Sequence, residues 1–304
     1  RLRRIYLSSA WLNSGSLRAG YAVRDLHTVY LNQHLPMPRL LDIHAQLSTA
    51  AHLDPLEEEY RLRMGHVSTL MRDRERAKQE YLQSCRRNPM AGVGVQQLGL
   101  ALSDADPKLQ DRLLASGTER EPRVPERYLL YSRWLLAHGS LAQAITVLSQ
   151  AIVSAPEGMP AIARFLAEQG FSNEELDQIL RRNANAWFEL GRTMETLSRA
   201  DAATRYYLKA LEYLDSGEAV PEYFRRPYEL YQRLQQQEQA MAILRQGINA
   251  LPDHSGFRIQ LGDYYAREGI GYRAREEYLQ ALRSDPSNQE LKKKIDKLDK
   301  SQEQ

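Results

Sequence analysis

The sequence contains a single cysteine, Cys85, among its 304 residues. One cysteine excludes an internal disulfide and any metal site built from several cysteines. An excess of either charge is also lacking, because 41 basic and 39 acidic residues leave a formal net charge of +2. Nucleic-acid-binding proteins usually carry a clear basic excess on one face. We therefore expect no nucleic-acid partner.

Long hydrophobic runs are missing as well. No apolar stretch approaches the roughly 20 residues that a membrane-spanning helix needs, so we expect no membrane span within this chain. No signal-peptide pattern is visible. Apolar residues make up 42% of the sequence and charged residues 26%, which is typical of folded globular chains and argues against disorder.

Three glycines lie close together in "NPMAGVGVQQLGLAL", residues 88–102, and raise the question of a phosphate-binding loop. The dinucleotide fingerprint would follow Gly92 and Gly94 with a third glycine at position 97, where this chain has Gln97. The sequence also has no Gly-Lys-Ser/Thr of a P-loop. These glycines are therefore predicted to serve helix packing, with Gly99 at a helix crossing.

Side chains in catalytic or metal-binding patterns are equally scarce. His44 and His52 are eight residues apart and match no short metal-ligand motif. Asp104 and Asp106 have the D-x-D spacing that some sugar-transfer enzymes use, but either can cap the helix that follows. No G-x-S-x-G sequence occurs, and Cys85 has no evident base beside it. We predict no catalytic, cofactor-binding or metal site, and we expect that the chain is not an enzyme.

Prolines recur in a similar local setting at a regular interval. Pro55 and Pro89 are 34 residues apart, as are Pro252 and Pro286, while Pro156 follows Pro89 after nearly twice that distance. A fixed period in this range indicates an array of helical repeats. Proline ends a helix because it lacks an amide proton and restricts the residue before it.

Other positions keep the same register when each unit is counted so that its proline falls near place 32. A large residue occupies place 7, small residues occupy places 8, 20 and 27, and a large residue occupies place 24. In the clearest units these five places are Met64, Gly65, Ala77, Tyr81 and Ser84; Tyr131, Ser132, Ala144, Leu148 and Ala151; Leu190, Gly191, Ala203, Tyr207 and Ala210; and Leu261, Gly262, Ala274, Tyr278 and Ala281.

This pattern resembles the tetratricopeptide repeat (TPR) family over roughly residues 40 to 288. The resemblance implies an all-α protein, a right-handed α-solenoid of tandem helix-turn-helix repeats with irregular units and a C-terminal capping helix. The small residues have a physical reason, because they stand where two helices approach closely. The unit at 221–254 is looser, since Pro227 and Tyr228 occupy places 7 and 8.

The resulting domain prediction divides the chain into five parts. Residues 1–57 hold N-terminal helices, around 7–32 and 39–54, and a partial first repeat. The degenerate unit at 92–124 is expected to have a shortened second helix, and Ser172 with Glu175 to form a capping box. The parts are 1–57; 58–158, with units 58–91, 92–124 and 125–158; 159–183, a short irregular helical pair; 184–288, with units 184–217, 221–254 and 255–288; and 289–304, the capping helix and tail.

The resemblance also implies where a partner would bind. In this family the first helix of each unit lines the concave face, through places 2, 5, 9, 12 and 13. Arginine recurs at these places beside apolar residues, which would suit a protein or an extended peptide with an acidic group. The alternative is a solvated face whose arginines pair with nearby Glu and Asp. The predicted contact residues are Leu129, Arg133, Phe188, Arg192, Arg225, Arg233, Ile259 and Arg267.

Some family members bind chaperone C-termini through a two-carboxylate clamp, with Lys at place 5 and Asn at place 9. Here these places hold Leu129 with Arg133 and Phe188 with Arg192. The clamp pattern is absent, so that ligand is not expected.

Two functions follow as hypotheses. The first is a non-catalytic protein–protein interaction scaffold that binds a partner on the concave face. The second starts from "AAHLDPLEEEYRLRMG", residues 50–65, which is similar to the start of TPR domains in some bacterial O-antigen ligase-like or polysaccharide-polymerising membrane proteins. The basic "RLRR" at the start fits an accessory domain of such a protein. This second hypothesis favours an extracytoplasmic location over a cytoplasmic one.

Overall fold

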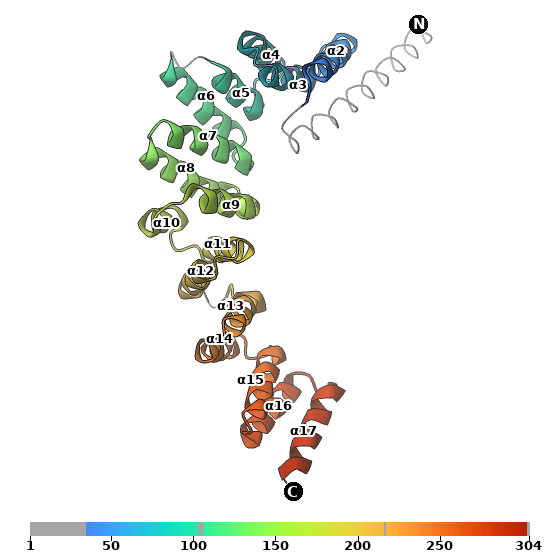
Figure 1. Cartoon of the computed structure of the whole chain (residues 1–304), viewed down its shortest axis with the longest axis vertical. Coiled ribbons are helices and arrows are strands. Elements are labelled where there is room, and N and C mark those ends of the chain that lie inside the picture. The colour runs from blue at the N-terminus through green and yellow to red at the C-terminus, as the bar shows by residue number, and fades with distance from the viewer. Residues whose placement is uncertain (1–34, 103–105, 216, 303–304) are drawn as a thin grey trace, which may run out of the picture. The chain divides into compact units, whose positions relative to one another are not determined.

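The computed structural model describes residues 35–102, 106–215 and 217–302, and every regular element in these ranges is a helix (Figure 1). The chain divides after Gly158 into two compact units. Each unit is described by itself below. The prediction of an all-α repeat fold is confirmed by the helices and by their pairing.

The first unit contains seven α-helices and a short 3₁₀ turn within the part of the chain that the structure describes. Pro36 and Pro38 stand at the start of its first helix, where a missing amide proton costs nothing. The elements are α2 (Met37–Leu53), α3 (Glu58–Leu70), α4 (Arg74–Arg87), α5 (Gly92–Ala101), α6 (Pro107–Arg120), α7 (Pro125–Ala137), α8 (Leu141–Ser154) and η1 (Pro156–Gly158).

The second unit begins with the shorter helices and continues with three regular pairs and a final helix. Its elements are α9 (Met159–Gln169), α10 (Asn173–Leu180), α11 (Ala184–Thr196), α12 (Ala200–Glu212), α13 (Pro221–Arg233), α14 (Gln237–Ala250), α15 (Ser255–Arg267), α16 (Gly271–Ser284) and α17 (Gln289–Gln302).

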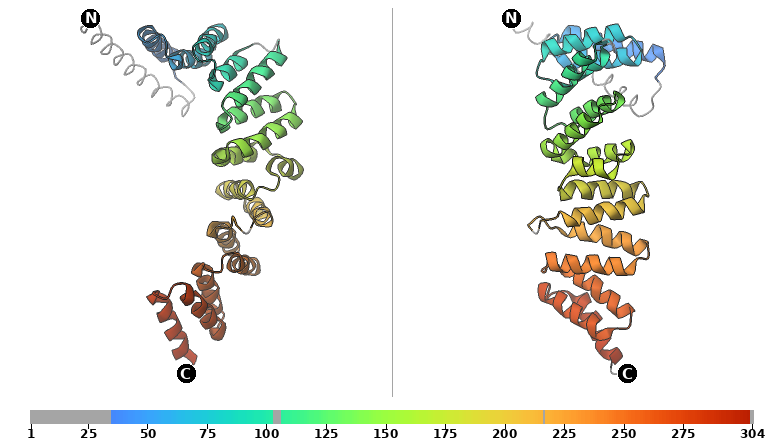
Figure 2. Two further views of the ribbon diagram at one scale, coloured as in Figure 1. Left: turned by 180° about the vertical axis from the view of Figure 1, so that it is seen from behind. Right: turned by 90° about the vertical axis from the view of Figure 1, so that its left-hand side faces the viewer.

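Helices pack as consecutive pairs within each unit, as Figure 2 shows. In the first unit α3 packs on α4, α5 on α6 and α7 on α8; in the second α11 packs on α12, α13 on α14 and α15 on α16. Each repeated proline stands two residues beyond the last residue of a helix: Pro55 after α2, Pro89 after α4, Pro156 after α8, Pro252 after α14 and Pro286 after α16. The period in the sequence is thus the period of the second helices.

The place-8 glycines lie under aromatic rings. A Cβ atom added to Gly191 would lie 2.7 Å from the Tyr207 ring, and one added to Gly262 would lie 2.5 Å from the Tyr278 ring. These distances are far below a normal contact between carbon atoms, so no other residue fits without movement. The small and large places of the repeat therefore meet each other across the helix pair.

Gly92 and Gly99 are packing glycines, as predicted, whereas a Cβ atom on Gly94 would make only ordinary contacts. A Cβ atom on Gly99 would lie 3.1 Å from the Leu113 Cβ, and one on Gly92 would lie 2.5 Å from the Gly117 carbonyl oxygen. The Gly92 amide donates a hydrogen bond to Glu121 Oε1 at 3.0 Å. Since that amide already has an acceptor, it does not form part of a phosphate-binding loop.

One local prediction is wrong. The second helix of the degenerate unit, α6, has 14 residues and is not shortened, whereas its first helix, α5, has only 10. The Asp106 side chain caps α6 by accepting from the Leu109 amide at 3.0 Å, and Pro107 occupies the first turn. Gly117 lies inside the helix, where the absence of a Cβ atom leaves room for the buried Gln96 side chain.

Other local predictions are confirmed. The helix expected around 39–54 is α2, and the capping box at α10 has both bonds, from the Glu175 amide to Ser172 Oγ and from the Ser172 amide to Glu175 Oε2. The helix expected around 7–32, like Asp104, lies outside the described residues.

Candidate functional site

The eight predicted contact residues lie on the first helices of their pairs, two in the first unit and six in the second. Leu129 is half-buried and Arg133 exposed on α7 of the first unit. In the second unit Phe188 and Arg192 lie on α11, Arg225 and Arg233 on α13, and Ile259 and Arg267 on α15. The structure brings three of these arginines into one cluster, and a fourth borders a separate pocket.

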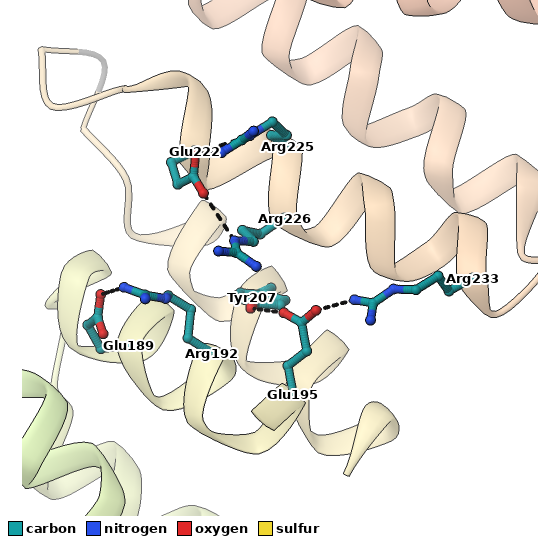
Figure 3. Close-up of polar contacts among 8 residues, drawn as sticks. All are labelled: Glu189, Arg192, Glu195, Tyr207, Glu222, Arg225, Arg226 and Arg233. Atoms are coloured by element: carbon teal, nitrogen blue, oxygen red, sulfur yellow. Dashed lines mark hydrogen bonds and ion pairs between the residues drawn. The ribbon is translucent and has the colours of Figure 1, made fainter. Parts of the chain in front are cut away.

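The cluster joins α11 to α13 through paired charges (Figure 3). On α11, Arg192 Nη1 lies 2.8 Å from Glu189 Oε1. Glu195 accepts a hydrogen bond from the Tyr207 hydroxyl at 2.6 Å and a second from Arg233, which comes from α13. A single carboxylate thus connects two consecutive repeats.

A second carboxylate organises the start of α13. Glu222 accepts from Arg225 through Nε at 3.1 Å and from Arg226 through Nε at 3.0 Å. In Figure 3 the Arg226 guanidinium lies between Glu222 and the Tyr207–Glu195 pair. Four arginines and three glutamates meet here, so the cluster has a net positive charge.

Two of the three carboxylates lie deeper than the guanidiniums they hold, whereas Glu222 is about as exposed as Arg226. The Glu189 and Glu195 side chains are each 14% exposed, whereas Arg192 is 47% and Arg233 58% exposed. Because an arginine has five N–H donors, the outer donors remain directed to solvent. We define the α11–α13 cationic surface as Arg192, Arg225, Arg226 and Arg233.

Electrostatics in this surface follow from burial and pairing. Burial raises the pKa of the Tyr207 hydroxyl, and the hydrogen bond to Glu195 raises it further, so Tyr207 stays a donor. For Glu222, burial acts to raise the pKa, but the hydrogen bonds from Arg225 and Arg226 outweigh it and lower the pKa below its usual value. The carboxylate is therefore ionised at neutral pH and keeps both arginines in place.

A groove lies beside this surface, between α9 and α11. Its volume is about 390 Å³, within the range of ligand-binding clefts. Arg192 forms part of its wall, so the groove is continuous with the cationic surface. The lining residues are Pro160, Arg164, Glu168, Glu189, Arg192, Thr193, Thr196 and Leu197.

Phe188 has a different position from the one expected of a contact residue. Its side chain is 5% exposed and packs on the rings of Tyr207 and Tyr223, with centroid distances of 5.3 and 4.7 Å. Phe188 supports the cationic surface from beneath and leaves little area for a partner. Ile259 on α15 is half-buried.

A second pocket lies farther along the same unit and involves Arg267. It has a volume of about 450 Å³ and is formed by α13, α15, α16 and α17. We call it the α13–α15–α17 pocket. Its lining residues are Tyr228, Gln232, Gln260, Asp263, Ala266, Arg267, Tyr278 and Lys294.

Several of these residues were not predicted from the sequence. Glu189 and Arg226 stand at place 6, which was not assigned to the partner-facing side, and Lys294 lies in the segment interpreted only as a cap. The i,i+3 and i,i+4 spacing of Glu189 with Arg192, and of Glu222 with Arg225 and Arg226, was the signal that could have identified the pairs.

Among the residues that the structure describes, no group of His, Cys, Asp or Glu side chains is placed to hold a metal ion. Within the same ranges, no helix has both the length and the apolar character that crossing a bilayer requires.

Comparisons with known proteins concern the fold alone. No protein-family model matches the chain, and no curated protein matches it. Among solved structures, it is similar to the type IV pilus biogenesis factor PilW, at 15% identity over 79% of this chain and 94% of that one, with a TM-score of 0.38. The C-terminal part of a TPR repeat-containing protein from Cytophaga hutchinsonii is 12% identical over 91% of this chain and 99% of that one, with a TM-score of 0.37.

A third similar structure is that of Cut9 with Hcn1 from the APC/C, at 14% identity and a TM-score of 0.35. It covers 85% of this chain and 52% of that chain, so this chain spans about half of its length. These similarities carry no function to the chain. The resemblance of residues 50–65 to membrane-bound glycan enzymes remains a prediction from the sequence.

Proposed function

We propose that this chain is a non-catalytic interaction scaffold, and that its α11–α13 cationic surface binds an acidic, extended segment of a partner protein. The observation that carries the proposal is the layering of charge in the second unit. Glu189 and Glu195 lie beneath Arg192 and Arg233, and Glu222 holds Arg225 and Arg226, so a partner meets guanidinium groups that are already oriented. An acidic segment is the partner that such a layer favours.

Pre-orientation matters because ordering a free side chain costs entropy on binding. An arginine held by one carboxylate has lost part of its rotamer freedom before the partner arrives. Near the start of α13, Arg225 and Arg226 share Glu222. At its end, Arg233 is held by Glu195, and on α11 Arg192 is held by Glu189. The remaining N–H donors suit the bidentate recognition of carboxylates.

An extended segment suits the site better than a compact one. The groove between α9 and α11 is continuous with the cationic surface through Arg192 on α11. The surface extends along α13 from Arg225, near its first turn, to Arg233, its last residue. A peptide in an extended conformation spans roughly 3.3 Å per residue, so acidic residues a few positions apart can reach successive arginines. A scaffold of this kind needs no catalytic group.

The test uses the full chain and a random peptide library displayed on phage. We expect the selected peptides to be rich in Asp and Glu. The double variant Arg192→Glu/Arg225→Glu should bind them at least about tenfold more weakly, because each reversal removes a charge-assisted contact and adds repulsion. Affinity is measured by fluorescence polarisation with the selected peptides, and folding by circular dichroism.

The matched control reverses two exposed arginines on second helices of the same unit, Arg245 on α14 and Arg283 on α16. Arg245→Glu/Arg283→Glu changes the net charge by the same amount and should leave the affinity unchanged. Selected peptides without acidic residues, or binding that survives Arg192→Glu/Arg225→Glu, would rule out this surface.

A further inference from the structure

The α13–α15–α17 pocket has an unusual balance of charge. Arg267, Lys294 and one carboxylate, that of Asp263, line it together, so the lining carries one positive charge in excess. The pocket lies in the second unit, where the final helix α17 closes one wall. It is distinct from the α11–α13 cationic surface, which has none of its residues.

Asp263 is paired within the protein through one of its two carboxylate oxygens. Its Oδ1 atom accepts from the Tyr278 hydroxyl at 2.6 Å and from Lys294 Nζ at 2.7 Å. The lysine also lies over the Tyr278 ring, 5.7 Å from its centroid. With a cation and a hydroxyl directed at it, this carboxylate is largely neutralised as a source of repulsion for an incoming anion.

Arg267, in contrast, is exposed in the last turn of α15 and has no carboxylate partner within the part of the chain that the structure describes. The surrounding arginines of α11 and α13 each have one. An unpaired guanidinium at the edge of a pocket presents its bidentate donor geometry to whatever enters.

A second donor, the Tyr228 hydroxyl, belongs to a residue that lines the same pocket. The Tyr228 oxygen accepts from Gln232 Nε2 at 2.6 Å, which leaves the tyrosine proton to be donated elsewhere. Burial raises the pKa of Tyr228, while the nearby charge of Arg267 acts to lower it and those of Asp263 and Glu229 act to raise it. The hydroxyl therefore keeps its proton at neutral pH and lies within the electrostatic range of Arg267.

We infer that the α13–α15–α17 pocket binds a single carboxylate group of a partner, held by Arg267 with the Tyr228 hydroxyl as a second donor. The inference deepens the proposed function, on which it rests for the presence of a protein partner. It adds a subsite in which α17 takes part, because Lys294 neutralises Asp263 and so keeps the pocket attractive to an anion. The carboxylate comes from an Asp or Glu side chain or from a chain terminus.

The experiment titrates three short peptides into the full chain labelled with nitrogen-15. All three are acetylated alanine pentapeptides. The first has a central glutamate and an amidated end, the second a central glutamine and a free carboxylate end, and the third a central glutamine and an amidated end. The observables are the side-chain Nε resonance of Arg267 and the backbone amides of α13 and α15.

We expect at least one of the two carboxylate peptides to shift the Arg267 resonance, and the neutral peptide to leave it in place. The peptide that acts identifies the source of the carboxylate. Arg267→Gln should weaken binding by roughly tenfold or more, since it removes a charge-assisted bidentate contact. Lys294→Gln should weaken it as well, because Asp263 then repels the ligand. Arg283→Gln, an exposed change on α16, is the matched control.

Equal shifts from the neutral peptide, no shift from any peptide, or full binding by Arg267→Gln would each overturn the inference. Because Arg267 is exposed, Arg267→Gln is expected to fold normally, and circular dichroism checks that it does. Arg192→Glu/Arg225→Glu should leave the pentapeptide shifts unchanged. Failure of the α11–α13 surface and failure of this pocket are thus separate outcomes.

Discussion

Glycine at place 8 and tyrosine at place 24 form a size-matched pair in three units of the chain. The pairs are Gly65 with Tyr81, Gly191 with Tyr207 and Gly262 with Tyr278. Where place 8 is the larger Tyr228, place 24 is the smaller Leu244. In the three Gly–Tyr units, the missing Cβ at place 8 leaves the space that the ring at place 24 fills, as expected for a closely packed interior.

The first prediction follows from this pairing. Gly191→Leu should lower the free energy of unfolding by about 1–3 kcal/mol or more, because the new side chain would have to displace the buried Tyr207 ring. Urea denaturation measures the change. Gly217→Leu is the control, since no atom lies within 4 Å of a Cβ added at that glycine. Equal stability of the two variants would contradict the predicted register.

At the scale of the helix pair, the turn between the two helices has the same backbone conformation in five units. Place 15 has a positive φ in five units: 61° at Arg72, 73° at Gly139, 58° at Ser198, 59° at Gln235 and 75° at Gly269. In each turn the next residue's amide donates to the carbonyl five residues back at 2.9 Å, as in a Schellman motif. Only two of the five residues are glycines, so three turns carry strain.

The second prediction concerns these three turns. Arg72→Gly, Ser198→Gly and Gln235→Gly should each raise the free energy of unfolding by roughly 0.5–1 kcal/mol, because glycine relieves the left-handed conformation at some entropic cost. Urea midpoints give the measurement. Gly139→Ala is the reverse change and should destabilise by a similar amount. Loss of stability in the three glycine variants would argue against strain at place 15.

The ends of the second helices were the most predictable feature, because prolines such as Pro89 and Pro252 indicate in the sequence that a helix ends just before them. The length of α6 was not predictable in the same way. A single glycine is tolerated inside a helix, so Gly117 did not mark the end of α6, and only the tertiary contact with Gln96 explains why that position is a glycine. A cap by Asp104 or Asp106 was predicted from the local sequence, and Asp106 provides it.

For the candidate site, the sequence predicted which side of the helices the residues lie on, but not how their side chains pair. The repeat register indicated that Arg192 and Arg233 point to one side, but not that Glu195 would accept from Arg233 in the following repeat. Such pairing depends on how successive helix pairs stack, which no local pattern encodes. The pocket at Arg267 needed, in addition, the position of α17 and its Lys294.

At the scale of the whole molecule, the two units differ in their response to acid. His66, in the first unit, has both ring nitrogens buried without a hydrogen-bond partner among the described residues. Burial lowers its pKa to about 4, with smaller contributions from Arg63 and Arg127. When folding lowers the pKa of a histidine, a fall in pH protonates the unfolded chain before the folded one, and this stabilises the unfolded chain. The first unit therefore loses stability as the pH falls from about 6.5 toward 4.

The third prediction is a selective loss of about 2 kcal/mol from the first unit between pH 7 and pH 5, where one pKa unit is worth about 1.4 kcal/mol. The chain is equilibrated in urea at both pH values and then pulse-labelled by hydrogen exchange at one common pH. Mass spectrometry of peptides from each unit separates the two transitions. His66→Phe should remove most of the pH dependence, and His52→Phe, at an exposed position on α2, should not. An equal loss in both units would be inconsistent with this assignment.

The last helix, α17, is tied to the pairs before it by two ion pairs, Lys294 with Asp263 and Arg275 with Asp299. It also buries Leu291 and Ile295, and among the described helices it packs mainly on α16. A helix with few neighbours opens more readily than one that is packed on both sides. Because α17 closes the α13–α15–α17 pocket, a bound carboxylate and a closed helix stabilise each other. Slower amide exchange along α17 would then report that the pocket is filled, without any label on the partner.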